Sequence, residues 1–248
     1  MSAAKRLTTC LLGLLLLGMG CAPARPIEGV WRPGFGEEPD RIPGPMRNFG
    51  PFDSYADALL AACPLLLSKP NATVGHLQDL NPELARRTAT EYCAWLYYTP
   101  EHRYEMSMLT DVSKPDDLVT GKKTCVLPKF VNDSRYAPGD LKYIFALHNH
   151  PFGKQLSLVD LHFIEAMASQ HDWKTETLKG DVYLSIIAFF SQSRDGEAPT
   201  CDGFHQYVPA TREIMTWVQT PAGWKKADDG LLRWLDDRRY IIERIQRR

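Results

Sequence analysis

The spacing of apolar residues changes from helical to alternating near residue 91, and this change limits the possible folds more than any other feature of the sequence. Before it, we predict a helix that begins at Ser54 and is stopped by Pro64, and a second helix from Asn81 to about Thr90. After it, the pattern predicts strands at 92–98, 103–109, 141–148 and 183–190, a helix at 157–169 and a C-terminal amphipathic helix at 231–245. This order predicts an α/β (α+β) domain whose central mixed β-sheet is flanked by helices.

The N-terminal segment has the features of an export signal. Lys5 and Arg6 precede an apolar run at 7–17 that is too short to span a bilayer as a helix. We therefore predict a signal peptide over residues 1–20, removed from the mature chain.

The residues before Cys21 resemble the lipobox of bacterial lipoproteins, in which this cysteine would carry the lipid and begin the mature chain. Gly18 stands where that motif usually has leucine. Cleavage after Ala24, with Ala22 as the other small residue, would instead release a secreted protein. The expected location is the cell envelope, as a lipoprotein on the outer membrane or periplasmic face, with secretion as the alternative.

Proline and glycine divide the mature chain into two parts. They are frequent in residues 21–52, so a linker that holds the domain away from the membrane is predicted there. Residues 53–248 are enough for one domain with its own core.

Cysteine usage fits an oxidising compartment. Loss of the signal peptide removes Cys10, and lipid would occupy Cys21. The cysteines that remain are Cys63, Cys93, Cys125 and Cys201. They can form two disulfides in three different pairings, among which the sequence does not choose. None has the CxxC spacing of a structural zinc site.

The charge balance argues against a nucleic-acid partner. The chain has 29 basic and 30 acidic residues and a formal net charge of −1, so no overall field attracts a polyanion. The letters HNH at 148–150 are not the HNH nuclease motif, whose residues are dispersed over a longer unit.

The segment from His148 to Asp160 has the pattern of a metal site. Residues two apart in a strand point to the same side, so His148 and His150 can direct both imidazoles at one point. Pro151 ends the strand, a short loop follows, and Ser157 begins a helix with Asp160 in its first turn. Two imidazoles and a carboxylate, with a fourth position left for water, are typical of a catalytic zinc.

Each part of this pattern also has a structural explanation. Ser157 and Asp160 form a helix capping box that needs no metal, and a histidine pair near a strand end is often a partly exposed turn. The capping box does not account for two histidines on one side of the preceding strand, and the combination therefore favours the metal site. We expect three further histidines, His162, His171 and His205, to be surface or core residues.

The motif resembles that of the JAB/JAMM (MPN) metallopeptidases, a glutamate followed by HxHP and SxxD, and especially the JAB-like domains of bacterial secreted and polymorphic-toxin proteins. The resemblance spans about residues 52–192, and the loop before Ser157 is one residue shorter than is usual in the family. It implies a cytidine-deaminase-like architecture, zinc on His148, His150 and Asp160, and Ser157 stabilising the tetrahedral intermediate. It also implies Glu91 as the proton shuttle.

Two other glutamates compete with Glu91 for that role. Glu105 falls in the second predicted hairpin strand, and Glu101 in the turn. Position favours Glu91, which stands between a helix and the first strand, although it could also be an exposed carboxylate at a helix end.

The resemblance implies a zinc-dependent metallopeptidase or isopeptidase that acts on a protein or peptide. One alternative is a catalytically inactive JAB-fold binding or scaffold module at the cell envelope. Another is a surface or toxin-related effector domain that acts on a partner protein or a cell-wall peptide. The sequence leaves open the substrate, the choice of peptide or isopeptide bond, and the oligomeric state.

Overall fold

The structure is a computed structural model that describes residues 26–34, 36–37, 40–75, 77–114, 124–153, 155–193 and 198–244. The predicted signal peptide, Cys21 and Ala24 lie outside these residues. The described helices are α2 (Tyr55–Leu67), α3 (Leu77–Leu80), α4 (Pro82–Thr88) and α6 (Leu158–His171). The described strands are β1 (Arg41–Gly44), β2 (Cys93–Tyr98), β3 (Tyr104–Met106), β4 (Phe130–Asp133), β5 (Lys142–Asn149), β6 (Lys174–Thr177), β7 (Gly180–Tyr183), β8 (Ser185–Phe190), β9 (Gly203–Val208), β10 (Glu213–Thr220), β11 (Gly223–Asp236) and β12 (Arg239–Arg244).

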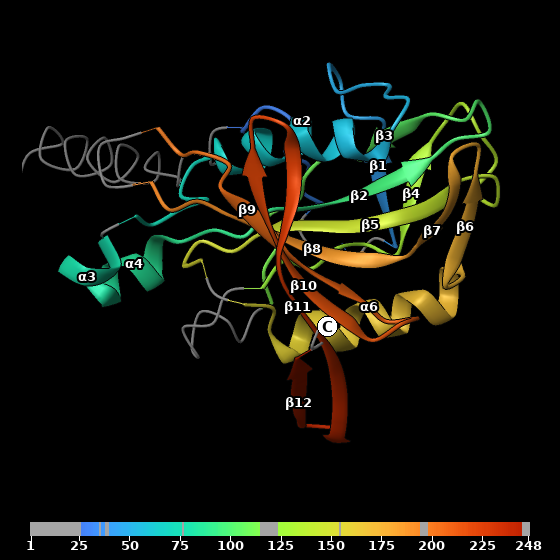
Figure 1. The fold of residues 1–248 in the computed structure, drawn as a ribbon. Coiled ribbons are helices and arrows are strands. Elements are labelled where there is room, and N and C mark those ends of the chain that lie inside the picture. Colours follow the sequence, from blue (N-terminus) through green and yellow to red (C-terminus); the bar gives the residue numbers. More distant parts are fainter. Residues whose placement is uncertain are drawn as a thin grey trace, which may run out of the picture.

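A large mixed sheet organises the chain (Figure 1). Its strand order is β12-β11-β10-β9-β8-β5-β2-β3. Neighbouring strands are antiparallel except β5 and β8, which are parallel and are connected through α6. A parallel pair needs such a crossover, because the chain must return to the starting end of the sheet. This crossover places the start of α6 at the end of β5.

Helices cover both faces of this sheet, and α2 and α6 lie on opposite sides of the strands (Figure 1). Side chains alternate between the faces along each strand. Leu96 and Leu147 belong to the core cluster that contains α2, whereas Trp95 and Ala146 belong to the cluster that contains α6. Burial on both faces explains why β2, β5 and β8 are almost continuously apolar. The predicted α/β class with one large mixed sheet is confirmed.

Most of the helices and strands predicted before residue 191 are present within a few residues of the predicted bounds. Ser54 caps α2 by accepting the amide hydrogen of Asp57 at 3.2 Å. The prediction that Pro64 stops this helix is wrong, because α2 continues to Leu67. Leu66 and Leu67 are completely buried, and their burial offsets the backbone hydrogen bond that proline cannot make.

The predicted C-terminal amphipathic helix is also wrong: β11 and β12 form an antiparallel hairpin at the edge of the sheet. The apolar residues follow helical spacing by coincidence. In the hairpin Leu232 is 1% exposed, while Leu231 and Leu235 are 41% and 51% exposed, which is the alternation of a strand. Pairing of β11 along β10 decides the conformation, as often happens when tertiary contacts oppose a local pattern.

Described residues of the predicted linker pack on the domain, beginning with Ile27. Arg41–Gly44 forms β1, which pairs in parallel with β4. Ile42, Met46 and Phe49 are buried, so the segment packs on the core despite its prolines. Pro43 is tolerated in this small two-stranded sheet, where its carbonyl accepts a hydrogen bond from Met108 at 2.8 Å.

The four cysteines form two disulfides, Cys63–Cys201 and Cys93–Cys125. The first joins α2 to the segment before β9, and the second joins the start of β2 to the segment before β4. Among the helices in the described ranges, none is long and apolar enough to cross a membrane.

Loss of the Cys63–Cys201 disulfide is expected to lower the free energy of unfolding by about 3–5 kcal/mol, because it closes a loop with a sequence separation of 138 residues. The test is denaturant unfolding of the Cys63→Ala, Cys201→Ala double variant against wild type without reductant. A matched measurement in reductant should remove most of the difference. Equal midpoints without reductant would contradict the expectation.

Candidate metal centre

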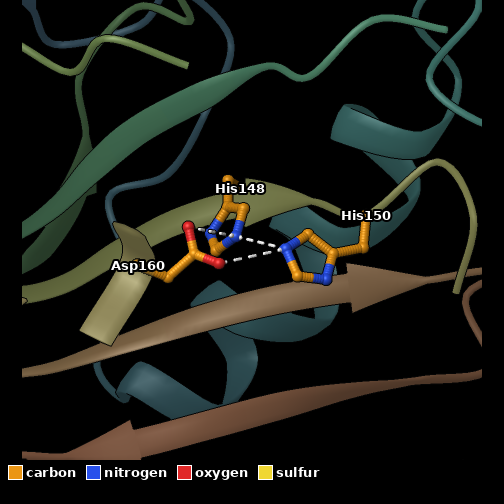
Figure 2. Close-up of side chains that lie close together, drawn as sticks. All are labelled: His148, His150 and Asp160. Atoms are coloured by element: carbon orange, nitrogen blue, oxygen red, sulfur yellow. Dashed lines mark hydrogen bonds and ion pairs between the residues drawn. The ribbon is translucent and has the colours of Figure 1, made fainter. Parts of the chain in front are cut away.

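His148, His150 and Asp160 converge on one point at the junction of β5 and α6 (Figure 2). The two Nε2 atoms lie 2.9 Å apart. His148 Nε2 is 3.5 Å from Asp160 Oδ1, and His150 Nε2 is 3.4 Å from Asp160 Oδ2. Both imidazoles are buried, and the carboxylate side chain is 16% exposed.

These distances fit a tetrahedral metal site. With bonds of about 2.0–2.1 Å to zinc, neighbouring donor atoms lie about 3.3 Å apart. The three separations, 2.9, 3.4 and 3.5 Å, are close to that value. The three side chains therefore could hold a metal ion, with the remaining coordination position left for another ligand.

The electrostatics of the site also favour a cation. Burial lowers the pKa of His148 to about 4, although the nearby Asp160 opposes this effect. For Asp160, burial acts to raise the pKa, but His148, His150 and the amide of Ser157 together hold it below its usual range. Neutral imidazoles and an ionised carboxylate are the forms that bind a divalent ion.

Asp160 also completes the predicted capping box. Its carboxylate accepts the amide hydrogen of Ser157 at 2.7 Å, and the hydroxyl oxygen of Ser157 accepts the amide hydrogen of Asp160 at 3.3 Å. The cap and the convergence with the histidines are therefore present together. The capping contact fixes the rotamer of Asp160 and so aims its other oxygen at His148.

Asn149, between the two histidines, faces the opposite side and holds the end of β5 in place. It is completely buried. Its amide nitrogen donates to the carbonyls of Ala72 at 2.7 Å and Thr90 at 3.0 Å, and its carbonyl accepts from the amide of Tyr92 at 2.7 Å. Sequence reasoning missed this role. The sequence did contain a signal for it. Side chains alternate between the two faces of a strand, so Asn149 must point away from His148 and His150 and into the core.

The loop after His150 is closed by a tight turn. The amide of His150 donates to the carbonyl of Phe189 at 2.8 Å, which extends the pairing with β8 past the end of β5. Gly153 has φ of 62° and donates its amide hydrogen to the carbonyl of His150 at 3.0 Å. Glycine adopts this left-handed conformation without strain. The short loop can therefore bring Ser157 and Asp160 back to the histidines.

Of the three candidate glutamates, Glu91 lies nearest to the convergent side chains. It lies two residues before Cys93, which pairs directly with His148 across β2 and β5. Glu91, His148 and Asp160 line one cavity of about 440 Å³. The side chain of Glu91 is partly exposed.

Glu105 lies at the other end of the strands. It is opposite Tyr97, which pairs with Tyr143, five residues before His148. Five residues of strand span roughly 16 Å. Glu101 is exposed in the turn beyond, where Tyr136 donates a hydrogen bond that lowers its pKa. Neither Glu101 nor Glu105 is brought to the metal centre.

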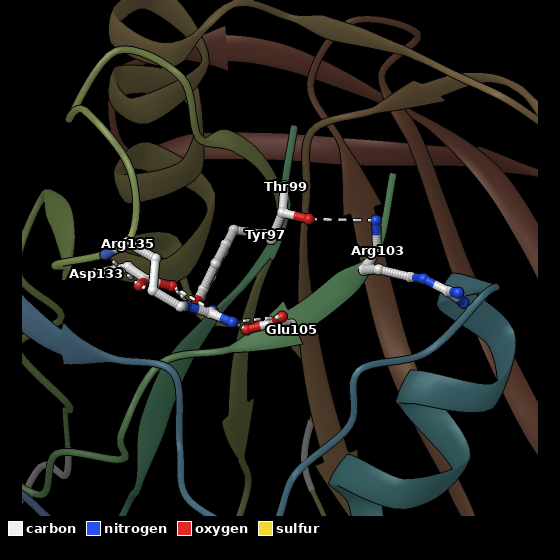
Figure 3. A network of polar contacts seen from close by, with 6 residues as sticks. All are labelled: Tyr97, Thr99, Arg103, Glu105, Asp133 and Arg135. Carbon is white, nitrogen blue, oxygen red and sulfur yellow. Dashed lines mark hydrogen bonds and ion pairs between the residues drawn. The ribbon is translucent and has the colours of Figure 1, made fainter. Parts of the chain in front are cut away.

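The environment of Glu105 explains its burial (Figure 3). The guanidinium of Arg135 pairs with Glu105 and, at 2.6 Å, with Asp133. The hydroxyl of Tyr97 donates to Asp133 at 2.9 Å. Buried carboxylates are costly unless paired, and Arg135 supplies the partner for both. This network ties β2, β3 and β4 together and has a structural role.

The three histidines predicted to be surface or core residues lie outside the metal centre. His171 stacks on Tyr143 with ring centroids 3.9 Å apart and donates to the carbonyl of Lys129. The exposed His162 donates to the carbonyl of Asp237 at 2.8 Å. Burial and, to a smaller extent, the nearby His150 lower the pKa of His205 to about 4, and its ring stacks on Phe190. Each of these rings has a partner that accounts for its position.

Comparison with known proteins gives no match: no protein-family model, no curated protein and no solved structure matches the chain.

Proposed function

We propose that this chain is a zinc-dependent metallopeptidase or isopeptidase with the JAB/MPN architecture, acting on a protein or peptide at the cell envelope. The convergence of His148, His150 and Asp160 carries the proposal. The resemblance to the JAB/JAMM motif supports it. The crossover from β5 through α6 to β8 also supports it, because it puts the start of a helix beside the end of a strand.

Zinc bound to these three residues would act as a Lewis acid and lower the pKa of a water ligand towards about 7. Glu91, on the wall of the same cavity, would accept a proton from the attacking water and pass it to the departing amine. The hydroxyl of Ser157 would donate a hydrogen bond to the oxyanion that forms on the substrate carbonyl. The partly buried setting strengthens these interactions by limiting competition from water.

The location is proposed from the N-terminal sequence. A signal peptide over residues 1–20 and lipid on Cys21 would tether the domain to the cell envelope. The two disulfides of the described residues are consistent with an oxidising compartment.

A catalytically inactive binding or scaffold module is the second candidate, and the capping box favours it. Ser157 and Asp160 satisfy each other's backbone amides without a metal, so the helix start needs no ion to form.

Zinc analysis combined with a cleavage assay tests both candidates. The purified mature protein is expected to contain about one zinc ion per chain, because the site has the donor set of a catalytic zinc. It should cleave members of a mixture of main-chain and lysine-linked peptides, as followed by mass spectrometry. Chelation should abolish cleavage, and added zinc should restore it. Stoichiometric zinc without cleavage would favour the scaffold, and absence of zinc binding would contradict both the metal site and the enzyme.

A further inference from the structure

The cavity of about 440 Å³ beside the metal centre is lined by a disulfide and by apolar side chains. We call it the disulfide pocket. Besides Glu91, His148 and Asp160, its lining includes the disulfide-bonded Cys93 and Cys125, His162 on α6, and the apolar side chains of Val126, Leu127, Val159 and Phe163. Its volume is at the small end of the range for ligand sites, which suits one large side chain and the backbone next to it.

One wall is the segment 124–127, which is held in place through its own contacts and those of the next residue, Pro128. The Cys93–Cys125 disulfide ties this segment to the start of β2. Trp95 donates its indole hydrogen to the carbonyl of Pro128 at 2.7 Å. The wall is therefore fixed to the same strand that pairs with His148, and the distance between wall and metal centre is set by the fold.

The inner surface of the disulfide pocket is apolar. Ala146, Ile186 and Leu127 line it and are 2%, 3% and 6% exposed. At its edges, Val126 on the wall segment and Val159 on α6 are 40% and 41% exposed. A ligand side chain that covers these two valines would remove their apolar surface from water.

We propose that the disulfide pocket is the specificity pocket of the enzyme and receives a large apolar side chain, such as phenylalanine or leucine, from the substrate residue next to the scissile amide. This inference rests on the proposed function. A peptide is the favoured occupant because His148 and Asp160 lie on the same cavity surface, so a side chain in the pocket brings its own backbone to the metal centre. The charged residues of the lining include Asp160, which belongs to that centre, Glu91, which the proposed mechanism uses as the proton shuttle, and the exposed Lys114.

Binding and cleavage of matched peptides test the proposal. The probes are acetylated and amidated tetrapeptides of glycine and alanine in which one position, at each place in turn, carries Phe, Leu, Asn or Lys. Calorimetry on the zinc-loaded Glu91→Gln protein measures binding without cleavage, and wild type gives kcat/KM. We expect a preference of about 10- to 100-fold for Phe or Leu over Asn and Lys at one position.

Two exposed positions give a matched pair of variants. Val126→Asn, in the pocket wall, should reduce the preference by about 10-fold, because one apolar contact is lost. Leu235→Asn, on β11 and 51% exposed, should leave it unchanged. Cys93→Ala with Cys125→Ala should also weaken the preference by releasing the wall. Zinc content and circular dichroism check that each variant keeps its site and fold.

The results separate this inference from the proposed function. Cleavage without an apolar preference, or a preference that Val126→Asn leaves intact, would overturn the specificity pocket and leave the enzyme in place. Apolar peptides bound selectively but never cleaved would retain the pocket as a binding site and remove the peptidase. No binding of any probe would overturn the pocket.

Discussion

The His148→Ala variant is expected to bind zinc about 100- to 1,000-fold more weakly than wild type. This loss of affinity corresponds to about one quarter of the binding free energy that is typical of a zinc site with four ligands. His148 Nε2 lies within 3.5 Å of both other donors, so its removal opens the site on one side. Zinc affinity can be measured by competition with a chromophoric chelator, and zinc content by elemental analysis.

His162→Ala is the matched control for this prediction. His162 lies two residues from Asp160 on the same helix, but its imidazole donates to the carbonyl of Asp237 and is not one of the three donors. Its loss should leave zinc affinity within a few-fold of wild type. If His148→Ala retained full affinity in a folded protein, the convergence of side chains would not be a metal site.

The Glu91→Gln variant is expected to keep its zinc and lose activity by about 10²- to 10⁴-fold in kcat, the range typical of a general acid–base group. Glutamine has nearly the same shape but cannot accept and return a proton at the operating pH. Glu91 is not one of the three convergent donors, so zinc content should stay at the wild-type level. Peptide cleavage and zinc analysis on the same preparation provide both measurements.

The other two glutamates serve as controls with different expected results. Glu101→Gln, in the exposed turn, should retain wild-type activity. Glu105→Gln should mainly lower stability, since it weakens the pairing with Arg135 far from the metal centre. Retained activity in Glu91→Gln, together with loss in either control, would assign the proton shuttle to another residue.

Much of the candidate site could be predicted because its geometry is local. Alternation along a strand puts His148 and His150 on one side, and the spacing from Ser157 to Asp160 is that of a helix cap; the structure has both. The same local rules failed for the predicted helix at 231–245, because its described residues, 231–244, belong to two strands and the turn between them. The spacing of apolar residues shows which side chains can share a face. Whether that face belongs to a helix or to a strand depends on the segments elsewhere in the chain that pair with it.

The sequence by itself was enough to predict an export signal, the α/β class, and a histidine pair followed by a helix capping box that contains an aspartate. Only the tertiary structure decided which cysteines pair and that Asp160 reaches the histidines. It also decided that Glu105 forms an ion pair with Arg135 and that Glu91 lines the same cavity as the metal centre. The reason is the range of the interactions. Helix caps and the alternation of side chains along a strand depend on residues only a few positions apart. The contacts that the sequence did not predict form when strands distant in sequence pair in one register and a crossover helix returns the chain to the end of the strand.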